Sequence, residues 1–199
     1  MRILLQAQIC ALFVLLPFIS LAQKQSLTYQ GFKGDDYIGD MIVSKKVEGN
    51  KVSFTSDAQL NVRFLLNWKL RFFYEVEYIN GNLHRSLVQI SRDGKLRTEV
   101  TGKRAGSHYL SDVDGDQVKL DAPLIDYCVL NTYFEAPKGK KRFFSERWGE
   151  YLEVAEKGEG RFILTPPNGS HNTLIYKNGH IQELQFNHSL ASVKFVLKE

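Results

Sequence analysis

Residues 132–150, TYFEAPKGKKRFFSERWGE, concentrate aromatic and charged side chains of the kinds that form ligand sites. One group combines rings with charges, and its members are candidate ligand or plug contacts: Tyr133, Phe134, Glu135, Phe144, Glu146, Arg147 and Trp148. A second group is basic and gives candidate anion contacts: Lys138, Lys140, Lys141 and Arg142. Rings bury apolar surface and cations attract anionic groups. The stretch therefore suits an amphiphile with an acyl chain and an anionic headgroup.

The same stretch also has a purely structural interpretation. Aromatic residues belong to cores more often than to ligand sites, so the segment can be a plug that completes the core rather than a lid over a pocket. We expect an Ω-like excursion that packs its rings onto one end of a barrel. A charge-assisted bond between Glu135 and Arg147 would anchor it. The basic group likewise has a plain alternative, a solvated surface loop.

Metal-binding patterns are weak elsewhere in the chain. Asp112, Asp114 and Asp116 alternate as in a calcium loop, but an EF-hand loop starting at Asp112 needs Gly at position 117 and Glu at 123, where this chain has Gln117 and Pro123. A polar Asp-Gly hairpin explains the stretch more simply. The histidines are spaced too widely along the chain to form a local metal pair. We predict no metal site.

Catalytic signatures are also missing. Ser145 lacks the G-x-S-x-G setting of an esterase nucleophile. The chain has neither the glycine-rich dinucleotide fingerprint nor a Walker loop. We therefore predict no catalytic residue and no cofactor. Because triads are recognised by geometry rather than by sequence position, a hydrolase or isomerase with dispersed catalytic residues stays open as an alternative.

Residues 1–22 have the layout of a secretory signal peptide. Arg2 supplies a short positive region, an apolar run follows at 9–16, and the small residue Ala22 precedes Gln23. The apolar run is too short to span a bilayer. We expect cleavage between Ala22 and Gln23 and a periplasmic or secreted protein.

The remaining chain, residues 23–199, is expected to form a single domain. Cys128 is the one cysteine left after cleavage, so no intrachain disulfide forms and the thiol is expected to be buried and inert. The formal net charge of +4, of which Arg2 contributes one, is too mild to indicate nucleic acid. No later segment is long and apolar enough for a transmembrane helix. The expected partners are an amphiphilic small molecule or an envelope protein.

The clearest strand covers residues 68–79. Its apolar side chains share one face: Trp68, Leu70, Phe72, Tyr74, Val76 and Tyr78. A three-residue loop at 80–82 keeps this face intact in the next strand, because it pairs Val76 with Ser86. The same loop pairs Tyr74 with Val88.

Asn-Gly and Asp-Gly turns recur along the chain and predict an antiparallel meander. In the hairpin after residue 90, a loop at 92–94 would pair Ile90 with Leu96. One short helix is expected at 123–131, capped by Asp121. About ten strands must curl or close, so we predict an all-β fold. It is a strongly curved antiparallel sheet, or a partly closed barrel.

The chain resembles a family of exported Gram-negative bacterial proteins of about this length, carried as a domain of unknown function. The resemblance rests on short motifs spread over the chain after the signal peptide: Ile38-Gly39-Asp40-Met41, Tyr133-Phe134-Glu135-Ala136-Pro137, Phe144-Ser145-Glu146-Arg147-Trp148-Gly149, Pro167-Asn168-Gly169, Asn172 and Tyr176-Lys177-Asn178-Gly179. It implies export and an all-β fold, and it supplies no catalytic residue.

The leading functional expectation is a non-enzymatic, barrel-like periplasmic protein. Such a protein would bind an apolar or amphiphilic ligand, or an envelope partner. A purely structural envelope component is a further alternative. The sequence does not identify the ligand or the oligomeric state.

Overall fold

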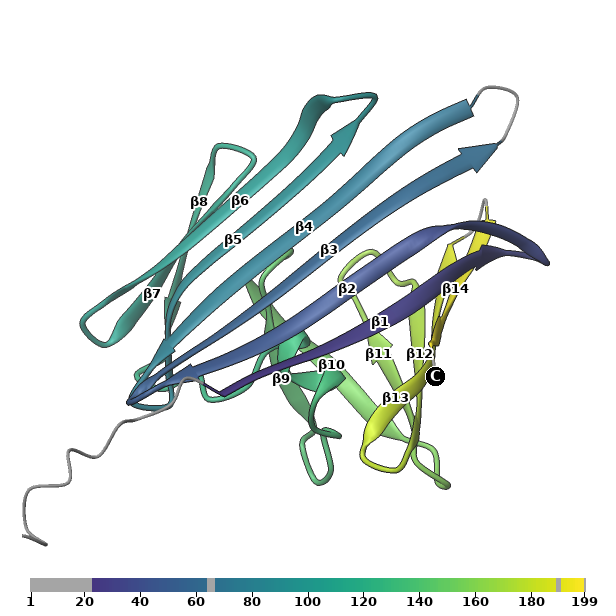
Figure 1. Cartoon of the computed structure of the whole chain (residues 1–199). Helices are drawn as coiled ribbons and strands as arrows, with labels where there is room; N and C mark the ends of the chain where they lie inside the picture. The colour runs from purple at the N-terminus through teal and green to yellow at the C-terminus, as the bar shows by residue number, and fades with distance from the viewer. Residues whose placement is uncertain (1–22, 64–66, 189–190, 199) are drawn as a thin grey trace, which may run out of the picture.

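The computed structural model describes residues 23–63, 67–188 and 191–198 (Figure 1). The strands alternate apolar and polar residues and are joined by short turns. They are β1 (Gln23–Lys33), β2 (Asp36–Glu48), β3 (Lys51–Arg63), β4 (Asn67–Ile79), β5 (Asn82–Arg92), β6 (Lys95–Ala105), β7 (His108–Val113), β8 (Asp116–Asp121), β9 (Arg142–Ser145), β10 (Glu150–Glu156), β11 (Arg161–Thr165), β12 (His171–Lys177), β13 (His180–His188) and β14 (Ala191–Leu197).

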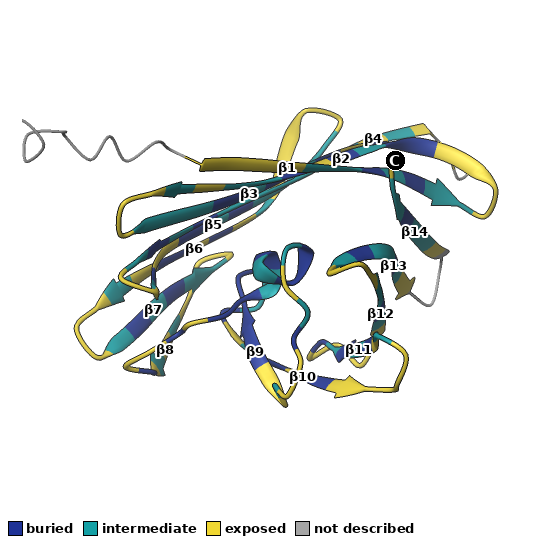
Figure 2. Ribbon diagram, turned by 60° about the horizontal axis from the view of Figure 1, so that its bottom comes forward, coloured by how far each residue is buried: buried dark blue, intermediate teal, exposed yellow. Residues whose placement is uncertain are grey.

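All these strands belong to one antiparallel sheet of 14 strands, which is more than the predicted ten. Its order is β8-β7-β6-β5-β4-β3-β2-β1-β14-β13-β12-β11-β10-β9, so the first and last strands pair in its middle. The sheet curls until its two arms face each other (Figure 2). Its edge strands, β8 and β9, do not pair with each other, so the barrel is not closed by hydrogen bonds. The predicted curved, partly closed all-β fold is confirmed.

The β4–β5 hairpin has the predicted register, with Val76 opposite Ser86 and Tyr74 opposite Val88. The predicted three-residue loop is wrong. The turn has two residues, Asn80 and Gly81, both with positive φ (52° and 74°), and the one-residue correction comes from a bulge next to Tyr78. A two-residue turn of this kind matches the strand twist, and the bulge restores the apolar face.

The β5–β6 hairpin differs from the prediction. Ile90 lies opposite Thr98 rather than Leu96, and Val88 lies opposite Val100. The turn is again a two-residue one, at Asp93-Gly94, and a bulge follows Ile90. Turn stereochemistry therefore decides the loop length in both hairpins, and the bulge then decides the register.

The helix predicted at 123–131 is absent. Residues 122–128 are mostly extended, and the 3₁₀ helix η2 (Val129–Tyr133) follows them. Asp121, the predicted cap, is the last residue of β8. The backbone of this segment bonds outward rather than to itself, because Leu83 N–H donates to Ile125 O (2.9 Å) and Phe144 N–H donates to Tyr127 O (3.2 Å). The segment thus crosses the interior between the two arms (Figure 2).

Side chains rather than a hydrogen-bond ladder seal the seam between the two sheet edges. The rings of Tyr109 on β7 and Phe144 on β9 meet edge-on at 5.1 Å. The β9–β10 turn packs against β7 at Gly149, where a Cβ would lie 3.0 Å from Ser111 Cβ. A Cβ at Gly102 would lie 2.6 Å from the Tyr109 ring, so the seam depends on a close backbone approach there.

The signal peptide predicted at 1–22 lies outside the described residues. Within the described ranges, no helix has the length and apolar character needed to cross a membrane. Cys128 is fully buried, as predicted.

Candidate functional site

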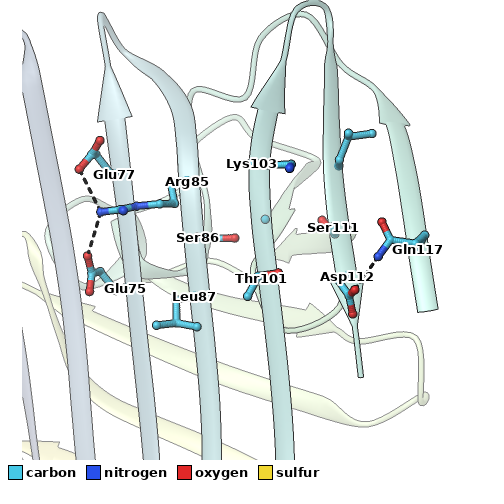
Figure 3. A pocket seen from close by; sticks show the side chains of 12 residues that line it. Glu75, Glu77, Arg85, Ser86, Leu87, Thr101, Lys103, Ser111, Asp112 and Gln117 are labelled. Carbon is cyan, nitrogen blue, oxygen red and sulfur yellow. Dashed lines mark hydrogen bonds and ion pairs between the residues drawn. The ribbon is translucent and has the colours of Figure 1, made fainter. Parts of the chain in front are cut away.

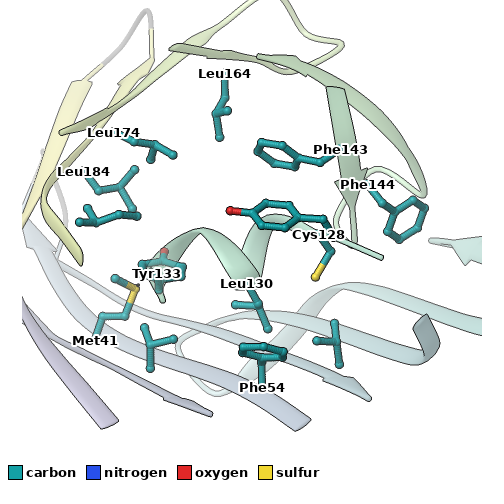
Figure 4. Close-up of a cluster of buried hydrophobic side chains, with 14 of the residues drawn as sticks. Met41, Phe54, Cys128, Leu130, Tyr133, Phe143, Phe144, Leu164, Leu174 and Leu184 are labelled. Carbon is teal, nitrogen blue, oxygen red and sulfur yellow. Dashed lines mark hydrogen bonds between the residues drawn. The ribbon is translucent and has the colours of Figure 1, made fainter. Parts of the chain in front are cut away.

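The interior of the curled sheet holds an apolar cavity of about 460 Å³ between the two arms. One wall comes from β2, β3 and β4 and the other from β11–β14, and side chains of both walls point into the interior (Figure 4). On the first wall, Met41, Ala58 and Phe72 form one cross-strand row. On the second wall, Leu174 and Leu184 pair across β12 and β13. This volume lies within the range of roughly 300–1,000 Å³ that is typical of small-molecule sites.

The helix η2 forms the floor of the cavity, to which it contributes Val129, Leu130, Thr132 and Tyr133. Two tyrosines hold it in place. The Tyr176 hydroxyl donates to Thr132 O (2.6 Å), and the Tyr78 hydroxyl donates to the Asn131 side-chain oxygen (2.8 Å). This five-residue helix is therefore positioned by the barrel wall, since it is too short to be stable alone.

Glu146 is the buried charge-bearing residue of the site, with 1% of its surface exposed. Its Oε1 accepts a hydrogen bond from Leu130 N–H (3.1 Å), which ties the β9–β10 turn to the start of η2. Its Oε2 is buried without a hydrogen-bond partner among the described residues. Burial raises the pKa of this carboxyl, and hydrogen bonds from the Cys128 thiol and from η2 backbone only partly offset it.

Arg147 and Trp148 stand at the rim of the cavity. The guanidinium stacks over the Trp148 ring at 5.1 Å, and its Nη2 lies 3.8 Å from Asp114 Oδ2. The predicted bond from Arg147 to Glu135 is therefore wrong. Glu135 is exposed, and its backbone oxygen accepts a hydrogen bond from the Tyr127 hydroxyl.

The structure separates the seven predicted ligand or plug contacts into three kinds. Tyr133, Glu146, Arg147 and Trp148 line the cavity. Phe134 and Phe144 are core residues: Phe134 packs on Phe54 at 5.7 Å, and Phe144 is completely buried. Glu135 neither lines the cavity nor packs in the core.

The stretch 132–150 is also not an Ω-like excursion. It contains the end of η2, the whole of β9 and the first residue of β10. Phe143 and Phe144 are core residues because β9 places them next to the interior segment, with Phe143 facing Tyr127 at 5.4 Å.

The basic group lies at the other end of the barrel, which corrects the expected pairing of a cationic loop with the ligand site. β9 runs from Arg142 toward Ser145, and the cavity meets its Ser145 end. None of the four basic residues, Lys138, Lys140, Lys141 and Arg142, lines the cavity. Lys140 pairs with Asp126 at 3.4 Å and lies over the Tyr127 ring, and Arg142 lies over the Tyr151 ring.

A second hollow of about 560 Å³ lies on the outer face of β4–β8 (Figure 3). Its charges already neutralise each other in part, because Arg85 lies 3.7 Å from Glu75 and 3.5 Å from Glu77. The groove is open and its ion pairs are largely exposed, so each pair contributes little to stability. It offers a weaker site than the interior cavity.

Sequence reasoning missed the residues of the second wall. Asn172 stands out, because it interrupts an apolar cross-strand row on the inner face, formed by Leu164, Phe186 and Val193. The neighbours that the residues of the second wall meet depend on strand order, which the sequence did not reveal.

The chain matches the family described as "Domain of unknown function (DUF6134)" over residues 29–198. The chain belongs to this family. It is also similar in fold to a crystal structure described as a beta-barrel-like protein of domain of unknown function DUF1849 from Brucella abortus. The TM-score is 0.55 at 11% identity, with 90% of this chain and 97% of that chain covered. No curated protein is similar enough in sequence to match.

These likenesses confirm the resemblance to an all-β domain of unknown function. At this identity, the structural neighbour is informative about the fold of the DUF6134 protein and not about its activity. Within the part of the chain that is described, no cluster of three or more His, Cys, Asp or Glu residues has the geometry to hold a metal ion.

Proposed function

We propose that this DUF6134 protein is an exported, non-enzymatic binding protein for an amphiphilic small molecule, whose apolar part occupies the cavity between the two arms of the sheet. The observation that carries the proposal is the cavity itself, about 460 Å³ and lined mostly by apolar side chains. Apolar lining with a few polar groups at one end is typical of small-molecule sites. The signal peptide predicted at 1–22 supports a periplasmic or secreted location.

The position of the cavity also supports ligand binding. The cavity opens at the end of the barrel that carries the β9–β10 and β11–β12 turns, since Trp148 and Asn168 line it. The half-buried side chains Leu70 and Phe72 extend the apolar surface along β4 toward that mouth. A ligand can therefore reach the interior without unfolding the sheet.

A neutral fluorescent probe, N-phenyl-1-naphthylamine, tests the proposal without any headgroup. We expect saturable binding of one probe per chain, with the emission rise that an apolar site produces. Ala58→Phe should reduce binding at least tenfold, because Ala58 lies on the cavity wall between Met41 and Phe72. Ala105→Leu, on an exposed residue outside the cavity, should leave binding unchanged.

Overpacking at position 58 can also unfold the protein, so a second variant is needed. Leu70→Gln changes a half-buried cavity residue and should weaken probe binding while the thermal melt stays cooperative. Wild-type protein that shows no saturable binding, or full binding by both folded cavity variants, would contradict the proposal.

A further inference from the structure

The charged side chains of the cavity are already committed to partners within the chain. Among the residues that line it, those with a formal charge at neutral pH are Glu146 and Arg147. Glu146 bonds Leu130 N–H, and burial favours its neutral form. Arg147 lies against Asp114, which compensates its charge, and it stacks on Trp148. Glu146 therefore presents no full negative charge to a headgroup, and the positive charge of Arg147 is shared with Asp114 across 3.8 Å.

Within the described residues, the second wall adds no further charged side chain to the cavity lining. Lys194 of β14 projects from the opposite face to its neighbours Val193 and Phe195, which line the cavity. The basic group of residues 138–142 is at the far end of the barrel, as described above. Among the described residues, Arg147 beside Asp114 is therefore the only cation that an anionic headgroup would meet in the cavity lining.

Uncharged polar groups occupy the mouth instead. Asn172 is half-buried on the inner face, and its row neighbours Leu164, Phe186 and Val193 are apolar. Its amide makes no hydrogen bond to any of the residues that the structure describes, although it lines the cavity. The amide is not among the buried polar atoms that lack a partner, so it is open to solvent, and its donors and acceptor can bond a polar atom of a ligand.

Three more uncharged residues stand beside Asn172 in the lining: Asn168, Ser170 and Asn187. Asn168 uses its side-chain oxygen inside its own turn, where it accepts from Ser170 N–H (3.1 Å) and from the Ser170 hydroxyl (2.8 Å). The amide NH₂ of Asn168 makes no hydrogen bond within the described chain, so its two donors are available. Amides donate and accept but carry no charge, which suits hydroxyl, ether or amide groups.

We infer that the headgroup of the bound amphiphile is uncharged and rich in hydrogen-bonding groups, such as a glyceryl, glycosyl or amide group, and that Asn172 contacts it. The inference rests on the proposed function and narrows its ligand class. Neutral headgroups can hydrogen-bond the side-chain amides of Asn168 and Asn172 without the cost of removing a charge from water. A charged headgroup would have to leave water for a mouth whose one described cation, Arg147, already faces Asp114.

Three dodecyl amphiphiles with different headgroups test the inference by displacement of N-phenyl-1-naphthylamine: a neutral glucoside, anionic dodecanoate and cationic dodecyltrimethylammonium. We expect the glucoside to bind at least tenfold more tightly than either charged compound, with little change between low and high salt. Tighter binding of dodecanoate, with loss at high salt, would overturn the inference and leave the proposed function intact. Failure of the probe itself to bind would instead overturn the proposed function.

Substitutions at Asn172 locate the headgroup. Asn172→Leu should lower glucoside affinity about tenfold while probe affinity stays within a factor of two. Asn172→Asp should weaken dodecanoate and strengthen the cationic compound. Asn178→Asp is the matched control, because Asn178 is exposed in the β12–β13 turn at the other end of the barrel. If Asn172→Leu and Asn172→Asp change no affinity more than Asn178→Asp does, Asn172 does not contact the headgroup.

Discussion

Glu146→Gln should change how the stability of the protein depends on pH. The carboxyl is buried, its Oε2 has no hydrogen-bond partner within the described residues, and its pKa is raised above the ordinary value of 4.5. The folded state therefore holds a proton that the unfolded state has already released. Stability from this group is complete below pH 4.5 and is lost as the pH rises toward the folded pKa. A glutamine side chain cannot ionise, so the variant escapes this loss.

The magnitude follows from a single proton. The difference in unfolding free energy between variant and wild type should grow in favour of the variant by at most about 1.4 kcal/mol per pH unit. The new amide hydrogens can lack a partner, which costs about 1–3 kcal/mol, but this cost is the same at every pH. The test is therefore how the difference in unfolding free energy changes with pH, and not its value at one pH.

The neighbours of Glu146 do not confuse the measurement, because burial raises the pKa of each and keeps it neutral between pH 4 and pH 8. They are Tyr74, Tyr78, Tyr109, Cys128 and Tyr133. For Tyr74 the pKa rises to about 12.

The assay is a series of urea melts from pH 4 to pH 8, followed by tryptophan fluorescence, for wild type, Glu146→Gln and the matched control Glu150→Gln. Glu150 is exposed at the start of β10, so its curve should run parallel to that of wild type. A flat difference for Glu146→Gln would refute the reasoning. A difference that favours wild type increasingly as the pH rises would show that the folded carboxyl is ionised and stabilised.

Two further predictions concern the seam and use denaturant melts. Phe144→Ala should lower the unfolding free energy by about 3–5 kcal/mol because the ring is completely buried. Lys141→Ala, three residues away and exposed, should change it by under about 0.5 kcal/mol. Equal effects of the two substitutions would contradict the assignment of β9. Gly102→Ala should lower the unfolding free energy by about 1–3 kcal/mol, because the new Cβ would lie 2.5 Å from Ser86 Oγ and 2.6 Å from Tyr109. The double variant Gly102→Ala with Tyr109→Phe should recover part of that loss. An unchanged melt for the single variant would show that the seam is loosely packed.

Much of the fold followed from local patterns. Period-two alternation in 68–79 identified β4 and its inner face, and the demand for an intact apolar face gave the register at Val76. The same reasoning failed at Ile90, because the two-residue turn and the bulge beside it together move its partner two residues, from Leu96 to Thr98, and a two-residue shift keeps every side chain on the same face. Helical spacing failed at 123–131, because the backbone there bonds to neighbouring strands instead of to itself.

The site was less accessible to sequence reasoning than the fold. Glu146, Arg147 and Trp148 were found because they cluster in the chain. Asn172 was noted only as part of the family resemblance and was missed as a cavity residue, since that role depends on neighbours on three other strands. The basic residues were misplaced because closeness in sequence does not fix the end of a barrel to which a strand delivers its side chains. The direction of β9 decides that, and it depends on the whole strand order.

The pairing of β1 with β14 has a consequence for synthesis. β1 is made early and gains β2 as a neighbour at once, but its other edge waits for a strand of 7 residues near the end of the chain. Until then the row of backbone donors and acceptors around Tyr29 is free to pair with other chains, as exposed edges do. Contacts as distant as Tyr29 with Leu197 also form slowly, because a long loop must close first. Each half of the sheet is a meander of sequential hairpins, and β14 is the strand that joins the two halves and covers the free edge of β1.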